Sequence, residues 1–352
     1  MKVNFIMPGL GDSGGMKVVY KYAKLLRNLN VDVKIYSAIL PSTSYKFSSK
    51  LANRIHQLYC LLKTSLFIKD KLDKGVTWVP MITNKYIRKA DITIATAWPT
   101  AYQVNKLSEK CGKKAYFIQD YEVWDNEAMG KKSYELPLEH IVIAKWINDI
   151  LVNELHVKPG YIVRNGIDTQ DFVPSKTQNY SNSVSCLMLY HQLPKKGIED
   201  GIAAYKIVKN RYPQITLNMF GMFNDPEISV VDHYYKSPQR SQLIKLYQKS
   251  DIFIYPSREE GWGLTPLEAM ACGCAVVGTM TGCMLELGES GENALLNKPR
   301  DINAMANNIE ILVENNKLRK KLSMNGRTTV ERLSWTKSAR TLKDTLNSIL
   351  NS

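Results

Sequence analysis

The chain has 352 residues, of which 44% are hydrophobic and 23% are charged, and this composition is typical of a folded globular protein rather than a disordered one. Its formal net charge is +14, and residues 1–172 carry 25 Lys and Arg against 16 Asp and Glu, which favours an anionic partner such as a membrane surface, a phosphorylated substrate or nucleic acid. No apolar run reaches the roughly 18 residues that span a bilayer, and the opening MKVNFIM has the pattern of a strand and not of a signal peptide.

Short strands rich in Val and Ile alternate with helical patterns through both halves of the chain. A helix is predicted at residues 16–30, where apolar residues recur at i, i+3 and i+4. Because such strands are separated by helices, we predict an α/β protein with doubly wound parallel sheets. The predicted strands are residues 2–7, 31–37, 91–97, 114–120, 140–144, 185–190, 215–220, 251–256 and 274–279.

The middle of the chain predicts a domain boundary. A strand pattern ends at Asn165-Gly166, and a stretch rich in Ser, Asn and Gln follows, so residues 166–183 are a predicted linker. We expect two Rossmann-like domains, residues 1–165 and 166–332, that face a central cleft. Residues 333–352 are expected to form a C-terminal helix that packs back toward the first domain.

Residues 41–75 depart from this alternation. They place seven lysines and arginines around a stripe of Leu, Ile and Phe. This pattern fits a basic amphipathic helix lying on an anionic membrane surface. A helix that covers the first sheet and turns its basic face to water is the commoner arrangement with the same pattern.

The six cysteines and five histidines are scattered along the chain. No Cys pair has the C-x-x-C spacing, and no His stands at zinc-ligand spacing from a Cys. We therefore expect reduced, buried thiols in a cytoplasmic protein, and we expect every histidine except His191 to be structural.

The segment DIFIYPSREEGWGLTPLEAMACGCAVVGT, residues 251–279, has the chemistry of a ligand site. A predicted strand ends shortly before Glu260, and ligands bind beyond the carboxyl ends of parallel strands. Gly261 and Gly263 let backbone N–H groups come close to a ligand, and the N-terminus of the helix that follows attracts phosphate. Glu268 lies one turn into that helix, where it could act on the same ligand.

Glu268 also has a structural explanation, because Thr265 as N-cap, Pro at the next position and Glu268 three residues on form the pattern of a capping box. The combination, however, is more specific. Glu260, seven residues and Glu268 around Gly-Trp-Gly, followed by EAMACG, resemble the E-x7-E signature of the retaining glycosyltransferases of family 4, which have the GT-B fold.

The resemblance implies a nucleotide diphosphate sugar as donor, bound mainly by the second domain. Glu260 would bind sugar hydroxyls, Glu268 would bind the ribose, and Lys196 with the helix N-terminus, predicted to begin at Thr265, would stabilise the diphosphate leaving group. The implied catalytic residues are Glu260, Lys196 and Asp120. The implied donor-binding residues are Gly14, Gly15, His191, Lys195, Lys196, Glu260, Gly261, Trp262, Gly263, Leu264, Thr265 and Glu268.

The resemblance covers most of the chain, with one departure. The matching segments are the glycine loop at residues 9–15, NGID at residues 165–168 and Lys196-Gly197. The family's diphosphate-binding arginine is replaced by His191 or Gln192. An imidazole does not provide the planar, bidentate fork of a guanidinium, so the role of that arginine stays open.

The acceptor side is expected in the first domain, near the end of the strand in AYFIQDYEVWD. Gln119 and Asp120 stand where the family often has a histidine, and Asp120 and Glu122 are candidates to contact the acceptor. A strand-end turn with solvated acids explains them equally well. Residues 96–102 end another strand and could line the same region, and YFIQDYE looks like the subset of the family that makes rhamnose-containing surface polysaccharides.

No D-x-D triplet occurs in the sequence, which favours a transfer without a metal or any other cofactor. The expected partners are the nucleotide-sugar donor and a glycan or lipid-diphosphate-linked acceptor, in the cytoplasm and peripheral on the inner membrane face. Three alternatives stay open: an inactive paralogue that binds sugar nucleotide, another two-domain enzyme such as an epimerase or phosphorylase, and a basic nucleic-acid-binding protein. The last is disfavoured because the positive charge is dispersed and no nucleic-acid-binding module is recognisable.

Overall fold

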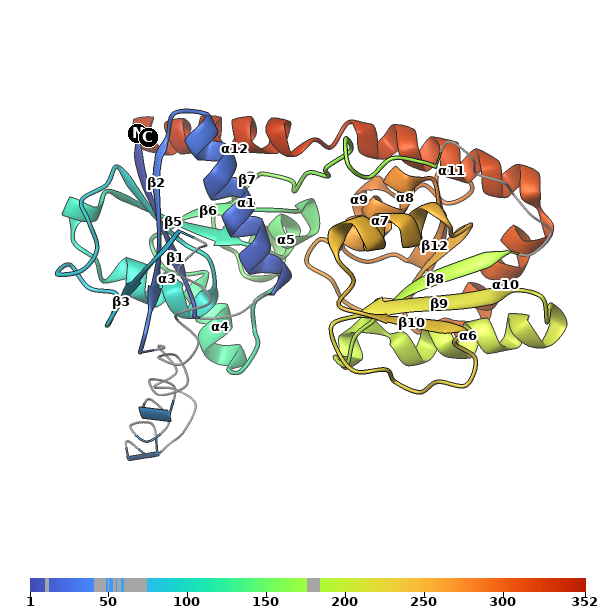
Figure 1. Cartoon of the computed structure of the whole chain (residues 1–352). Helices are drawn as coiled ribbons and strands as arrows, with labels where there is room; N and C mark the ends of the chain where they lie inside the picture. The colour runs from blue at the N-terminus through green and yellow to red at the C-terminus, as the bar shows by residue number, and fades with distance from the viewer. Residues whose placement is uncertain are drawn as a thin grey trace. The chain divides into compact units, whose positions relative to one another are not determined.

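The computed structural model describes residues 1–9, 13–40, 75–175 and 184–352, together with positions 49, 51–52, 55 and 58–59. These residues form two compact units. The N-terminal unit consists of residues 1–165 and 335–352, and the C-terminal unit consists of residues 166–334 (Figure 1). Most of the predicted basic helix at 41–75, the tip of the glycine loop at 10–12 and the end of the predicted linker at 176–183 lie outside the described residues.

The N-terminal unit is built on a parallel sheet with the strand order β3-β2-β1-β4-β5-β6-β7. Its inner strands are buried on both faces because helices cover them, which explains their continuous apolar sequences. The strands are β1 Lys2–Met7, β2 Asp32–Ala38, β3 Val76–Val79, β4 Ile92–Ala95, β5 Lys113–Ile118, β6 Glu139–Val142 and β7 Tyr161–Ile162. The described α-helices are α1 Gly14–Asn28, α3 Trp98–Asn105, α4 Glu127–Ser133, α5 Lys145–Asp149 and α12 Trp335–Asn351, with a 3-10 helix at Glu109–Cys111 and a π-helix at Ile150–Glu154.

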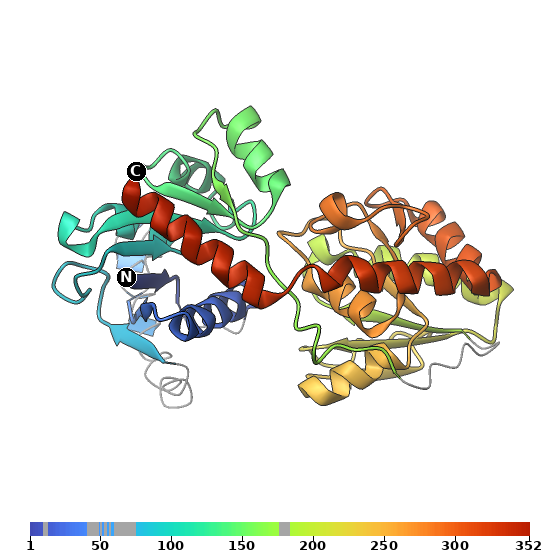
Figure 2. The same ribbon diagram turned by 90° about the horizontal axis from the view of Figure 1, so that it is seen from above.

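The last helix belongs to this first unit. Figure 2 shows α12 beside α1, and the ring of Trp335 at the start of α12 makes an edge contact of 5.4 Å with the ring of Tyr22. The Tyr22 hydroxyl donates to the backbone oxygen of Arg164. The chain therefore returns to its first domain after completing the second.

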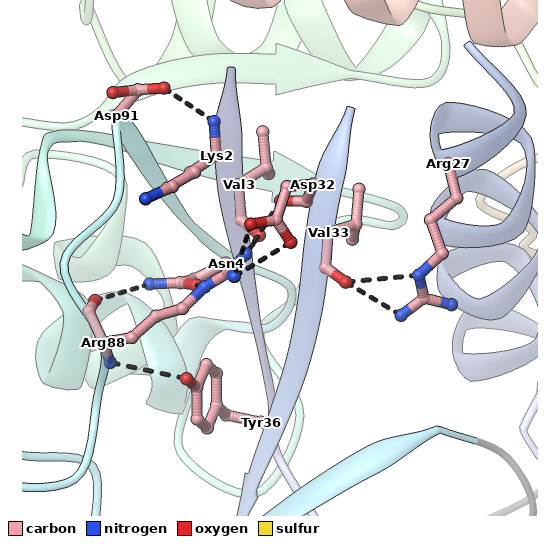
Figure 3. Close-up of polar contacts among 9 residues, drawn as sticks. All are labelled: Lys2, Val3, Asn4, Arg27, Asp32, Val33, Tyr36, Arg88 and Asp91. Atoms are coloured by element: carbon pink, nitrogen blue, oxygen red, sulfur yellow. Dashed lines mark hydrogen bonds and ion pairs between the residues drawn. The ribbon is translucent and has the colours of Figure 1, made fainter. Parts of the chain in front are cut away.

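Arg88 closes the amino-terminal edge of the N-terminal sheet (Figure 3). Its guanidinium donates to both carboxylate oxygens of Asp32 at 2.9 and 2.8 Å and to Oδ1 of Asn4 at 3.0 Å. These hydrogen bonds hold the pKa of Asp32 below its usual value. Arg88 thus bridges the amino-terminal ends of β1 and β2. Ligands of parallel sheets bind at the opposite edge, where the carboxyl ends of the strands lie.

The C-terminal unit repeats the scheme with the strand order β10-β9-β8-β11-β12-β13, all parallel. Its core packs Met188, Ile254 and Val277 of the central strands against the flanking helices. The strands are β8 Ser185–Tyr190, β9 Thr216–Gly221, β10 His233–Lys236, β11 Ile252–Tyr255, β12 Ala275–Thr279 and β13 Leu295–Asn297. The helices are α6 Ile198–Arg211, α7 Arg240–Gln248, α8 Leu264–Cys272, α9 Met284–Leu287, α10 Ile302–Glu314 and α11 Asn316–Glu331, and a short turn covers Pro194–Lys196.

The predicted class, two Rossmann-like domains with parallel sheets, is confirmed. The five described cysteines are buried and free, as expected of reduced thiols. Within the described ranges, no helix is long and apolar enough to pass through a bilayer.

Candidate functional site

The candidate site of the C-terminal unit is built from two loops that follow neighbouring strands, β8 and β11. The Nζ atom of Lys196 lies 2.5 Å from Oε1 of Glu260, and both side chains are largely buried, with 17% and 13% of their surface exposed. The hydroxyl of Ser257 donates to the same carboxylate oxygen at 3.2 Å. Two residues that the sequence places 64 positions apart thus form one ion pair at the carboxyl edge of the sheet.

The loop that carries Lys196 is joined to the loop that carries Glu260. The backbone N–H groups of Arg258 and Glu259 donate to the carbonyl oxygen of Lys195 at 2.8 and 3.1 Å. Gly197 has a φ of 62°, and a Cβ atom there would lie 2.1 Å from a backbone oxygen of the facing loop. Only glycine therefore allows this close approach.

A second link joins the two loops through side chains. Nε and Nη2 of Arg258 each donate at 2.7 Å to one oxygen of Asp200, near the start of α6. Both side chains are mostly buried, so the bidentate pair is shielded from water. Arg258 and Asp200 are not among the residues predicted from the sequence, because no local pattern relates two residues 58 positions apart.

Helix α8 begins at Leu264 with Gly263 at its N-cap, where φ is 82°. Thr265 therefore lies inside the first turn, and no side chain caps this N-terminus. The predicted helix start at Thr265 and the capping-box explanation of Glu268 are both wrong, because the left-handed glycine starts the helix earlier. The open N–H groups of the first turn point away from the helix beside the loop of Glu260.

Glu268 is held by a residue that the sequence did not identify. The hydroxyl of Tyr247, at the end of α7, donates to Oε2 of Glu268 at 3.0 Å. Burial raises the pKa of Tyr247 well above its ordinary value, so the phenol stays protonated and able to donate. Tyr247 packs in turn against the rings of Phe172, Phe220 and Phe253.

Two other predicted donor-binding residues have structural contacts. His191 accepts a hydrogen bond at Nδ1 from the backbone N–H of Leu193 at 3.0 Å, and its ring lies 5.0 Å from that of Phe223. Burial, and then the charge of Lys196, lower the pKa of His191, which favours a neutral ring. Trp262 is a core side chain, with only 3% of its surface exposed, and Gly261 beside it is buried as well.

The N-terminal unit brings the glycine loop to the end of β5. A Cβ atom on Gly15 would lie 3.4 Å from the side-chain amide of Gln119, and Gly14 begins α1 after the N-cap Ser13. The next residue, Asp120, accepts a hydrogen bond from the backbone N–H of Tyr121 at 2.9 Å. The predicted Gly14, Gly15 and Asp120 therefore gather at the carboxyl edge of this sheet.

Glu122, a candidate for acceptor contact, is instead a buried structural residue with 5% of its surface exposed. Its Oε2 accepts hydrogen bonds at 2.6 Å from the backbone N–H of Trp98 and from the hydroxyl of Tyr116. Burial raises the pKa of Glu122 to about 8. A carboxyl in this position fixes the first turn of α3 and does not face a ligand.

Among the residues that the structure describes, no group of three His, Cys, Asp or Glu side chains is arranged to hold a metal ion. The chemistry that can be read from the described side chains is therefore that of one lysine, two glutamates and an open helix N-terminus. Such a set suits a ligand that combines a phosphate group with hydroxyls.

Known proteins match this chain in sequence. The family described as glycosyl transferases group 1 matches residues 170–329. An uncharacterized glycosyltransferase of Methanocaldococcus jannaschii is 26% identical over 203 residues, 56% of each chain. The O-antigen biosynthesis protein RfbC of Myxococcus xanthus is 27% identical over 271 residues, 73% of this chain and 21% of that protein. The matched regions thus cover about half or less of these relatives.

Solved structures match the fold over its whole length. Sucrose-phosphate synthase from Thermosynechococcus elongatus superposes with a TM-score of 0.74 at 17% identity, covering 100% of both chains. The Anabaena protein HepE in complex with UDP gives a TM-score of 0.75 at 16% identity, covering 99% of this chain and 100% of that one. These neighbours share the GT-B fold with this chain. Residues 170–329, which contain Lys196, Glu260 and Glu268, therefore match the family of glycosyl transferases group 1, in a chain whose two Rossmann-like domains have the GT-B fold.

Proposed function

We propose that this protein transfers a sugar from a nucleotide diphosphate sugar to a glycan or lipid-diphosphate-linked acceptor. The observation that carries the proposal is the ion pair of Lys196 and Glu260, set beside the uncapped N-terminus of α8. A lysine and open helix N–H groups bind a diphosphate, and a carboxylate accepts hydrogen bonds from sugar hydroxyls. Placed together, they match the two halves of such a donor.

The proposed mechanism follows from the charge that develops when the glycosidic bond breaks. Positive charge forms on the sugar ring as it becomes oxocarbenium-like, and negative charge accumulates on the departing diphosphate. Lys196 and the first turn of α8 stabilise the diphosphate, Glu260 orients the sugar, and Glu268 binds the ribose. We propose that configuration is retained and that no metal is required, because lysine and backbone N–H groups supply the stabilisation of the leaving group.

The relatives support a role in surface polysaccharide synthesis. One is an O-antigen biosynthesis protein, and another, from Campylobacter jejuni, is an N-acetylgalactosaminyltransferase whose name gives a sugar carried on diphospho-undecaprenol as its acceptor. HepE was solved with UDP. We propose a hexose donor and the cytoplasm as the site of the reaction, with the protein peripheral on the inner membrane face.

The test is a panel of UDP-, GDP-, dTDP- and ADP-linked sugars with EDTA present, read by thermal shift and by nucleotide release. We expect one donor to raise the Tm of the wild type and Glu260→Ala and Glu268→Ala to lose that response. The neighbouring Glu259→Ala is the matched control. The side chain of Glu259 is exposed, and the described hydrogen bond of Glu259 to the lysine loop is made by its backbone N–H, which the substitution keeps. If no donor binds, or if all three variants respond alike, the proposed function is wrong.

A further inference from the structure

Trp124 in the N-terminal unit presents an indole ring to solvent. Of the six tryptophans of the chain, all within the described residues, it is the only exposed one, with 45% of its surface accessible. It lies after β5, on the carboxyl edge where ligands of parallel sheets bind. Single exposed apolar side chains are common on protein surfaces, so it is the position of this ring at the ligand edge, together with the rigid support described below, that points to a ligand.

The backbone beneath this ring is fixed on both sides. The carbonyl oxygen of Trp124 accepts hydrogen bonds from Nε1 of Trp98 at 3.1 Å and from the backbone N–H of Asn126 at 2.8 Å. Asp125 between them has a φ of 63°, a left-handed conformation that is uncommon for a residue other than glycine. The segment is thus held in one conformation and is not a loose loop.

Trp124 also rests on a second ring that is itself fixed. The rings of Trp98 and Trp124 lie 5.6 Å apart and are tilted by 57°. Trp98 is buried, its backbone N–H is bound by Glu122, and its ring meets that of Tyr102 at 6.3 Å. The ring of Trp124 therefore rests on a rigid support, and its side chain loses little conformational entropy when a ligand stacks on it.

We propose that Trp124 stacks against the ring of a pyranose, so that the acceptor ends in a sugar ring rather than in a bare lipid phosphate; this inference rests on the proposed function. The face of an indole carries partial negative charge, and the C–H groups on one face of a pyranose are weakly positive. The hydroxyls at the edge of the same sugar need hydrogen-bond acceptors. Asp120, on the same segment, supplies carboxylate oxygens of that kind.

The proposal is tested by saturation-transfer NMR with methyl pyranosides of glucose, galactose, mannose, rhamnose and N-acetylglucosamine, with UDP present. We expect the wild type and Trp124→Phe to give signals for at least one glycoside, and Trp124→Ala to weaken binding about tenfold or more. Met81→Ala removes another exposed apolar side chain of the same unit, 49% accessible, and should leave the signals unchanged. Unchanged Tm values for all variants would show that folding is intact.

Absence of signals with the wild type, or equal signals for wild type and Trp124→Ala, would overturn the proposal. An exposed tryptophan can also bind a membrane surface, and cosedimentation with phosphatidylglycerol vesicles tests this alternative. If Trp124→Ala abolishes vesicle binding and keeps the glycoside signals, the residue contacts lipid and the proposal fails. Nucleotide release from nucleotide sugars, measured separately on the same proteins, reports on donor binding and cleavage alone. If the wild type binds glycosides but neither binds nor cleaves a nucleotide sugar, the proposed function is wrong, while the stacking of a pyranose on Trp124 still stands.

Discussion

Two glutamates at the carboxyl edges of the two sheets have opposite environments. Glu260 in the C-terminal unit forms an ion pair with Lys196 and keeps part of its surface accessible. Glu122 in the N-terminal unit is buried, and its hydrogen-bond donors are neutral: the hydroxyl of Tyr116 and the backbone N–H groups of Trp98 and Gln119. Burial raises the pKa of Glu122 to about 8. A glutamate after a parallel strand is therefore no sufficient sign of a binding site. Its partners decide whether it offers a charge to a ligand or braces the fold as a neutral acid.

The largest effect is expected at the charged pair. Lys196→Ala should lower kcat/KM for sugar transfer by about 100- to 1000-fold, because the diphosphate loses its cation in the transition state. Glu260→Gln should also reduce transfer, and the double variant should lose less than the product of the two single effects, since the residues act as one unit. Steady-state kinetics of the four proteins measures this coupling.

The neighbouring lysine provides the control for that cycle. Lys195 contributes its backbone carbonyl to the joined loops, and that contact survives substitution of the side chain. Lys195→Ala should therefore cost much less activity than Lys196→Ala. Equal losses at the two positions would mean that general positive charge, and not the ion pair, is what the reaction needs.

The second prediction concerns Glu122, whose raised pKa makes the folded state hold a proton more tightly than the unfolded chain does. The stability from that proton is full below about pH 4.5, the ordinary pKa of the group, and is lost as the pH rises toward about 8. Glu122→Gln, which resembles the neutral acid, should remove this decline. Denaturant unfolding from pH 5 to 8 should show the free energy of unfolding of the wild type falling relative to Glu122→Gln by up to about 1.4 kcal/mol per pH unit. Parallel curves would mean that Glu122 is ionised in the fold.

The central strands of both sheets are predictable from the sequence, while the edge strands are not. The nine predicted strands lie at the centre of the sheets, where coverage by helices on both faces demands continuous apolar residues. The four edge strands, β3, β7, β10 and β13, have four residues or fewer. Strands β3, β10 and β13 were missed, and β7 was indicated only by a strand pattern that ends at Asn165-Gly166. A sequence such as HYYK in β10 carries no burial signal, because an edge strand is only partly covered.

The candidate site divides in the same way between local and distant signals. Each of the two loops can be recognised in the sequence from the end of a predicted strand, a glycine and a charged residue. The family resemblance assigned Lys196 and Glu260 to the same donor, but their ion pair was not predicted, since no spacing rule joins residues 64 positions apart. The capping pattern at Thr265 gave a wrong helix start because it considers only neighbouring residues. The helix starts instead after Gly263, whose left-handed backbone packs so close to Tyr255 that a Cβ atom would lie 2.5 Å from the Tyr255 hydroxyl oxygen.

The third prediction tests whether the link between Arg258 and Asp200 positions the ion pair. Arg258→Lys keeps the charge but cannot bind both carboxylate oxygens, so the two loops should separate slightly. We expect kcat/KM to fall about tenfold, mostly through kcat, because a small misplacement of Lys196 weakens transition-state binding. Asp200→Asn should act in the same direction. A lower Tm with unchanged kcat and KM would show that the link stabilises the fold only.

The smallest effect is expected at the hydroxyl that holds Glu268. Tyr247→Phe removes one hydrogen bond to Oε2 of Glu268 and keeps the ring packing, so donor binding should weaken by only about 0.5–1.5 kcal/mol. Tyr205→Phe is the matched control, because the Tyr205 hydroxyl is also buried in this unit but donates to the backbone oxygen of Ile215. Donor titration by calorimetry should separate the two variants even where their Tm values agree. If both weaken the donor equally, the loss reflects general softening of the domain; if only Tyr247→Phe does, the orientation of Glu268 is what the tyrosine provides, and the second glutamate acts on the donor rather than on the helix.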